Sequence, residues 1–182
     1  NVKKILALSL LIFSIFVFAC SQEMTRSFTK TGYSFSGKKK LALVNVYVQS
    51  KRDNLTVRRQ VITEFELQLK QKGYSIIAQD AVTAALKELT LPIDREYTAT
   101  EMEKLKEKLN AEILVQGYVS EEAESLISDT QNINFHFKYY DGSDGRFVAE
   151  ALYQNKGSKT IIEAELVTRG IINVLSPLGI QK

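Results

Sequence analysis

The sequence contains few of the residues that carry chemistry. It has one cysteine, Cys20, one histidine, His136, two prolines and no tryptophan. A single cysteine excludes an intrachain disulfide and a thiolate metal cluster, so the fold must be stabilised by packing. A single histidine leaves no second imidazole to share a metal ion. Neither glycine-rich phosphate-binding pattern follows a strand, which argues against a nucleotide site.

An excess of one charge is also missing. The 182 residues include 24 basic and 21 acidic side chains, and two of the lysines, Lys3 and Lys4, lie in the N-terminal segment. Nucleic-acid binding needs a clustered basic face, so we expect no nucleic-acid partner. An apolar content of 45% with 25% charged residues is typical of one globular domain.

One long apolar run stands near the start of the chain. Lys3 and Lys4 precede residues 5–19, in which Ser9 and Ser14 are the polar interruptions. A positive segment followed by a run of this length is the layout of a secretory signal. A spanning helix needs about 20 apolar residues, so the run is short for a permanent span. We therefore expect residues 1–19 to be a cleaved signal peptide.

The run ends in Val17-Phe18-Ala19-Cys20, which resembles the lipobox of bacterial lipoproteins, although Phe18 is larger than the residue usual there. The resemblance implies acylation of Cys20, and two acyl chains at roughly 0.8 kcal/mol per buried methylene anchor a domain stably. The alternative is an incidental cysteine in an ordinary signal peptide. In such lipoproteins a serine at the next position, here Ser21, favours the outer membrane, with the domain facing the periplasm.

Residues 20–37 are predicted to be the lipidated cysteine followed by a flexible tether, because they are rich in Ser, Thr and Gly and lack a sustained period. The domain is then expected over residues 38–182. Apolar runs and alternation predict strands over 41–49, 74–78, 111–119, 132–140 and 146–154. Helical spacing and capping residues predict helices after Asp53 or Asn54, Asp80, Thr98 and Ser158. The order βαβααβββα and right-handed crossovers predict a single α/β domain with a mixed sheet packed by helices.

Three segments carry a family resemblance. These are Gly73-Tyr74-Ser75-Ile76, the strand Asn110-Ala111-Glu112-Ile113-Leu114-Val115-Gln116-Gly117, and the hairpin turn closed by Asp144-Gly145. The region from Lys38 to Leu175 resembles a superfamily of periplasmic lipoproteins. That superfamily includes the curli-secretion pore protein, the lipoprotein activators of penicillin-binding proteins and the N-terminal domain of the Tol–Pal translocation protein. The resemblance implies a non-enzymatic, lipid-anchored domain that binds or assembles with envelope proteins.

The polar residues give no stronger indication of catalysis. His136 lies on the polar face of a predicted strand without a Ser/His/Asp arrangement, so we interpret it as a surface or edge residue. Asp141 and Asp144 supply two acids where a calcium loop needs more ligands, so we interpret the segment as a turn. We therefore predict no enzyme activity, no metal and no cofactor.

The C-terminal helix is predicted to carry apolar residues on more than one side. Ile162, Leu166 and Ile172 lie beside its inward stripe, and Tyr139 and Tyr140 stand near the hairpin. These five residues are candidate interface residues, because tyrosine is enriched at binding hot spots. Burial against the sheet and a neighbouring element explains them as well.

The leading functional hypothesis is a lipid-anchored envelope protein that binds an envelope partner or assembles into a homo-oligomer. A small hydrolase or ligand-binding periplasmic protein is one alternative, for which acids should converge with His136 in a deep cleft. A surface-exposed adhesin is the other.

Overall fold

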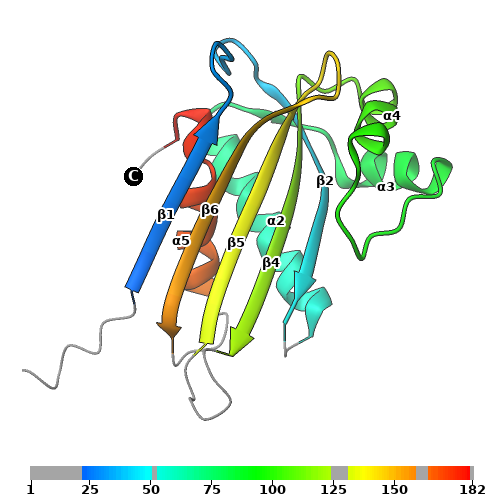
Figure 1. The fold of residues 1–182 in the computed structure, drawn as a ribbon. Coiled ribbons are helices and arrows are strands. Elements are labelled where there is room, and N and C mark those ends of the chain that lie inside the picture. Colours follow the sequence, from blue (N-terminus) through cyan, green and yellow to red (C-terminus); the bar gives the residue numbers. More distant parts are fainter. Residues whose placement is uncertain (1–21, 51–52, 124–130, 159–163, 181–182) are drawn as a thin grey trace, which may run out of the picture.

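A six-stranded mixed sheet forms the centre of the molecule in the computed structural model (Figure 1). The structure describes residues 22–50, 53–123, 131–158 and 164–180. The strands are β1 (Gln22–Thr29), β2 (Lys40–Gln49), β3 (Ser75–Ile76), β4 (Ile113–Ala123), β5 (Gln131–Asp141) and β6 (Phe147–Ser158). The helices are α2 (Asn54–Gln71), α3 (Gln79–Glu88), α4 (Ala99–Leu109), α5 (Ala164–Val174) and the 3-10 turn η1 (Ser176–Leu178).

The strands lie in the order β1-β6-β5-β4-β2-β3. Strand β2 pairs in parallel with β3 and β4, and the other neighbours are antiparallel. The predicted fold class is therefore confirmed as an α/β domain with a mixed sheet. The predicted element order also holds from β2 to α5, with β1 added in front of it.

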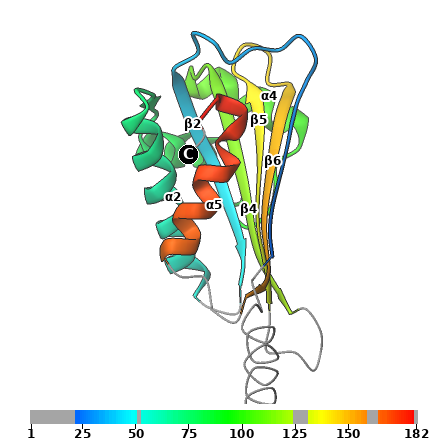
Figure 2. The ribbon, with the colours of Figure 1, turned by 90° about the vertical axis from the view of Figure 1, so that its left-hand side faces the viewer.

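Helices α2 and α5 cover one face of the sheet, which we call the closed face (Figure 2). The α2 residues that recur every four positions are almost wholly buried: Val57, Val61, Phe65 and Leu69. Phe65 stacks on Phe137 of β5 with ring centroids 5.4 Å apart. Helix α5 approaches closely at Gly170, where a Cβ atom would lie 2.7 Å from the ring of Phe135. The closed face therefore holds the main hydrophobic core.

Helices α3 and α4 pack on the opposite face, over β2, β4 and the Tyr140 end of β5 (Figure 1). Their apolar residues form a second, smaller core with Ala42, Val44, Leu114 and Tyr140 of the sheet. Thr98 begins α4 with the predicted capping box, since its side chain accepts from the Glu101 N–H while Glu101 accepts from the Thr98 N–H. The outer parts of β5, β6 and β1 have no helix over them on this face.

Strand β1 overturns part of the tether prediction. Gln22–Thr29 pairs antiparallel with β6 along its whole length, so these residues are sheet rather than flexible linker. An edge strand exposed to solvent can be polar, which is why its composition is indistinguishable from that of a tether. Cys20 and the predicted signal, residues 1–19, lie outside the described residues.

Strand β6 extends to Ser158, and the helix α5 is described from Ala164 onward. The predicted start of this helix after Ser158 falls on residues 159–163, which lie outside the described residues. No helix in the described ranges combines the length and apolar character needed to cross a membrane.

Candidate protein-binding face

Outward-facing side chains of β1, β6 and β5 form the face that the helices leave uncovered. Strand register places Arg26 beside Leu152 and Leu152 beside His136 in one row across these strands. The next row joins Phe28, Glu150 and Lys138. We call this set the open sheet face: Arg26, Phe28, His136, Lys138, Glu150 and Leu152.

The period-two geometry of β5 and β6 separates this surface from the core. Phe135 and Phe137 point to the closed face and are fully buried, whereas His136 and Lys138 between them point outward and are half-buried. His136 Nε2 lies 3.1 Å from Glu150 Oε2 on the neighbouring strand. A hollow of about 310 Å³ lies over this pair and extends to Arg26, Phe28 and Leu152.

Two aromatic rings extend the open sheet face toward the β5–β6 hairpin. Phe28 is 50% exposed and stacks on Phe147, which is 37% exposed, with centroids 6.3 Å apart. Phe147 meets the buried ring of Tyr140 edge-on at 6.0 Å. Exposed aromatics held by a buried ring are a typical anchor for a protein partner, because they lose little side-chain entropy on binding.

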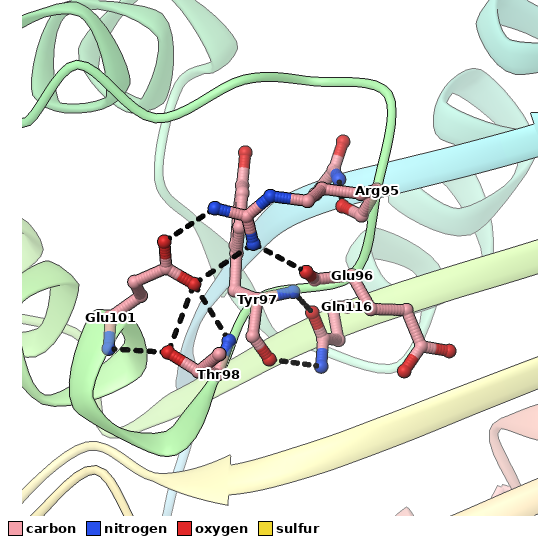
Figure 3. A network of polar contacts seen from close by, with 7 residues as sticks. Arg95, Glu96, Tyr97, Thr98, Glu101 and Gln116 are labelled. Carbon is pink, nitrogen blue, oxygen red and sulfur yellow. Dashed lines mark hydrogen bonds and ion pairs between the residues drawn. The ribbon is translucent and has the colours of Figure 1, made fainter.

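The loop between α3 and α4 borders the open sheet face and is fixed to it by buried hydrogen bonds (Figure 3). Gln116 of β4 is 3% exposed, and its Oε1 accepts from the Tyr97 N–H at 2.8 Å. Its Nε2 donates to the Tyr140 hydroxyl at 2.6 Å. Lys138 Nζ donates to Glu96 Oε2 at 2.5 Å, which connects the loop directly to the open face. The border is therefore fixed by side-chain contacts rather than by strand pairing.

An ion pair stabilises the same loop where it enters α4 (Figure 3). Arg95 holds the Glu101 carboxylate through contacts of 2.6 and 3.0 Å. The Arg95 side chain, followed by the Thr98 N–H, lowers the pKa of Glu101 to about 2. Glu101 therefore keeps its charge in the folded protein well below the pH at which a free carboxylate is protonated.

Most of the predicted interface residues are buried in the structure. Tyr139 is fully buried and its hydroxyl donates to the Val174 carbonyl, Tyr140 is 6% exposed beneath Gln116, and Leu166 is 4% exposed. These residues fill the two cores and do not form a surface, so the prediction that they contribute to an interface is wrong. Ile172 is half-buried on α5, and Ile162 lies outside the described residues.

The acids around the hairpin form a turn, as the sequence indicates. Asp141 pairs with Lys38 and accepts from the Ser143 N–H, while Asp144 pairs with Arg146 at 3.6 Å. Burial alone would raise the pKa of Asp141, but the hydrogen bonds from Lys38 and Ser143 outweigh it and hold that pKa below its ordinary value. Both acids thus serve to close the hairpin.

The structure gives little support to metal binding or to a catalytic histidine. Within the described ranges, no three of the His, Cys, Asp and Glu side chains gather as metal ligands would. His136 meets one carboxylate, that of Glu150, in a shallow hollow rather than a deep cleft. His136 is placed as predicted, on the polar side of an inner strand.

Sequence reasoning missed the β1 part of the open sheet face. Arg26 and Phe28 were assigned to the tether, yet both lie on the same side of a strand. The available signal was the alternation of Met24, Arg26 and Phe28 with small polar residues, among them Thr25. An eight-residue polar alternation is a weak signal unless the strand that it pairs with is known.

Comparison with known structures finds similar folds at low sequence identity. The sequence matches no protein-family model and no curated protein, so the likeness rests on structure alone. The PelC dodecamer from Paraburkholderia phytofirmans aligns with a TM-score of 0.52 and 18% identity over 88% of this chain and 100% of that chain. Lipoprotein GNA1162 from Neisseria meningitidis aligns with a TM-score of 0.51 and 17% identity over 70% of this chain and 90% of that chain.

The LpoB C-terminal domain from Salmonella enterica aligns more weakly, with a TM-score of 0.48 and 9% identity over 70% of this chain and 87% of that chain. Because its TM-score is this low, the LpoB alignment supports no conclusion about this chain. The GNA1162 alignment confirms the predicted resemblance to a lipoprotein at the level of fold alone. The curli-secretion and Tol–Pal parts of that resemblance stay predictions.

Proposed function

We propose that this protein is a lipid-anchored component of the cell envelope that binds a protein partner through the open sheet face and catalyses no reaction. The observation that carries the proposal is a sheet covered by helices on one face and only partly on the other. An antiparallel sheet can leave a polar face in water, but this face also exposes the stacked rings of Phe28 and Phe147. The exposed side chains of Phe28 and Phe147 therefore favour a protein partner that covers this face of the sheet.

The chemistry of the open sheet face fits a protein better than a small molecule. Phe28 and Leu152 supply apolar area, while Arg26 and the His136–Glu150 pair supply polar contacts around it. Hot spots combine aromatic or arginine anchors with a polar rim in this way. The hollow is shallow, and no acid other than Glu150 lies with His136 in it, so a small hydrolase or binding protein is less well supported.

The lipid anchor is supported by the sequence and fits the position of β1. If Cys20 is the acylated residue, β1 begins at Gln22, two positions later, so the start of this strand would stand beside the bilayer. The open sheet face would then rise away from the membrane instead of moving freely on a tether. The likeness of the fold to a Neisseria lipoprotein and to a PelC dodecamer supports an envelope location and assembly with protein.

The partner is tested by replacing Phe28 with a photocrosslinking amino acid in the full chain and irradiating intact cells. We expect crosslinks to an envelope protein or to a second copy of the chain. The matched control places the same amino acid at Leu67, which is 47% exposed on α2 and remote from the open face. Equal crosslinking at both positions, or none at Phe28, contradicts the proposed face.

The anchor is tested separately by labelling cells with a fatty acid and comparing wild type with Cys20→Ala. We expect the label to disappear in the variant, and label that persists contradicts acylation at Cys20. Protease added to whole cells tests the adhesin alternative, since a domain that faces the periplasm survives this treatment.

A further inference from the structure

Strand β2 has a long edge without a strand beside it. Strand β3 pairs with only Lys40 and Leu41 of β2, and Gln79 Nε2 donates to the carbonyl of Leu43 at 3.4 Å. From that point to Gln49, the pairing of β2 within the described residues is with β4 on its other side. A sheet edge of this length presents a row of backbone donors and acceptors to a further strand.

This edge has no charge to protect it against pairing, and its one irregularity is the shift in register with β4 between Leu43 and Asn45. Residues 43–49 read LVNVYVQ, without a charged residue or a proline. Natural edge strands are commonly protected by lysine, proline or an inward charge, because an uncharged β-branched edge recruits other chains. A secreted domain that keeps such an edge is expected to cover it with a specific partner.

A groove lies along this edge and has both apolar and polar lining. It has a volume of about 150 Å³, and Val46 and Val48 of β2 line it together with the polar side chains of Asn54 and Asp94. Leu55 of α2, 61% exposed, forms one wall, and Ile93 of the α3–α4 loop, 48% exposed, forms the other. The side chains that flank an added strand would therefore meet apolar surface on both faces of the sheet.

Arg58 contributes a cation to the groove, and among the described residues it forms no ion pair, although Asp94 lines the same groove. Its Nε is buried without a hydrogen-bond acceptor among the described residues, and its Nη2 reaches only the Asn45 amide oxygen, at 3.4 Å. A buried guanidinium donor without an acceptor is costly, and a carboxylate on an incoming strand would satisfy it.

Strand β1 of a second copy is the occupant that the strand order favours. It forms the opposite edge of the same sheet, and the chain of strand pairings makes it antiparallel to β2. The Lys30 N–H donates to Val148 of β6, so the alternation of an antiparallel ladder turns the backbone of Glu23, Thr25 and Ser27 outward. Glu23, which pairs with Arg169 of α5 in its own copy, also brings a carboxylate to this sheet edge.

We propose that copies of this chain join through β1 of one copy and the β2 edge of the next, which makes their sheets continuous. The contact uses two different surfaces, so it is heterologous and closes into a ring when the rotation between copies allows. Every copy then has its N-terminus at the same end of the assembly, as a common lipid anchorage requires. The inference rests on the proposed assembly role, but it is independent of which partner covers the open sheet face.

The experiment measures the mass of the full chain, purified in detergent, by analytical ultracentrifugation. We expect an oligomer for wild type and its loss in Leu55→Lys/Ile93→Lys, which places charges on both groove walls. Ser27→Pro changes the other surface of the contact, the outer edge of β1. It removes an N–H that points away from β6, so β1 should stay paired with β6 while the oligomer is lost. Leu67→Lys, the same change at another exposed leucine of α2, should leave the oligomer intact.

Circular dichroism spectra identical to wild type establish that each variant is folded. A monomeric wild type overturns the inference, as does an oligomer that survives both the groove and the β1 substitutions. Crosslinking from Phe28 to another envelope protein by a monomeric chain would overturn the inference alone and leave the proposed function standing.

Discussion

The two faces of the sheet are built from the same strands and differ in what covers them. On the closed face, Phe135 and Phe137 are fully buried under α2 and α5. On the open sheet face, His136 and Lys138, their immediate neighbours in sequence, are half-buried and are held by single polar contacts to Glu150 and Glu96. Because side chains alternate along a strand, one side of the sheet is buried and stabilises the fold, while the other side remains available for binding a partner.

The largest expected effect comes from comparing the loss of stability when one phenylalanine on each face is replaced by alanine. Phe65→Ala removes a fully buried ring that stacks on Phe137, and the cavity should cost about 3–5 kcal/mol of the free energy of unfolding. Phe28→Ala removes an exposed ring and should cost about 0.5–1 kcal/mol, the value of its contact with Phe147. Urea denaturation measures both, and equal losses would contradict the assignment of the two faces.

A smaller effect concerns the loop that borders the open sheet face. The pKa of Glu101 is lowered to about 2, so its carboxylate stabilises the fold above the ordinary carboxylate pKa, and this contribution is lost as the pH falls toward 2. Glu101→Gln should cost about 1 kcal/mol at neutral pH and reduce the loss of thermal stability between pH 5 and pH 2.5.

Glu107→Gln is the control for removing one negative charge, because Glu107 is exposed on the same helix. It should leave the acid dependence of the melting temperature close to that of wild type. A Glu101→Gln variant whose melting temperature falls with pH as steeply as that of wild type would contradict the stabilising role of the Arg95–Glu101 pair.

The smallest expected effect compares two polar side-chain contacts of equal length, one on each side of the molecule. His136 and Glu150 lie 3.1 Å apart on the open sheet face, and Lys70 and Glu66 lie 3.1 Å apart on α2. Glu150→Gln and Glu66→Gln should each change the free energy of unfolding by about 0.5 kcal/mol or less, because both pairs are solvated. Only Glu150→Gln should weaken crosslinking from Phe28, and an equal effect of Glu66→Gln would argue against the face.

Much of the fold could be predicted from local patterns. The four-residue spacing from Val57 to Leu69 indicates the buried stripe of α2, and Thr98 with Glu101 indicates the start of α4. The alternation from residue 133 to 139 indicates which residues of β5 lie in the core. These signals are local because helix and strand periods are fixed by backbone geometry.

The candidate site was harder to predict because it depends on pairing between distant segments. Phe28 joins the open sheet face only when β1 pairs with β6. Tyr140 stays on the same side of β5 as His136 and Lys138 but is buried, because the second core under α3 and α4 covers that end of the strand. Neither event has a local signature. The burial of Leu166 likewise depends on how α5 docks on the sheet.

The sequence by itself determined the periods, the caps and the single cysteine that marks the proposed anchor. Only the tertiary structure decided which face of the sheet the helices cover and which strand edges stay unpaired. The physical reason is that a strand's alternation defines two sides but does not say what packs on them. That choice depends on crossovers and on contacts between residues far apart in the chain.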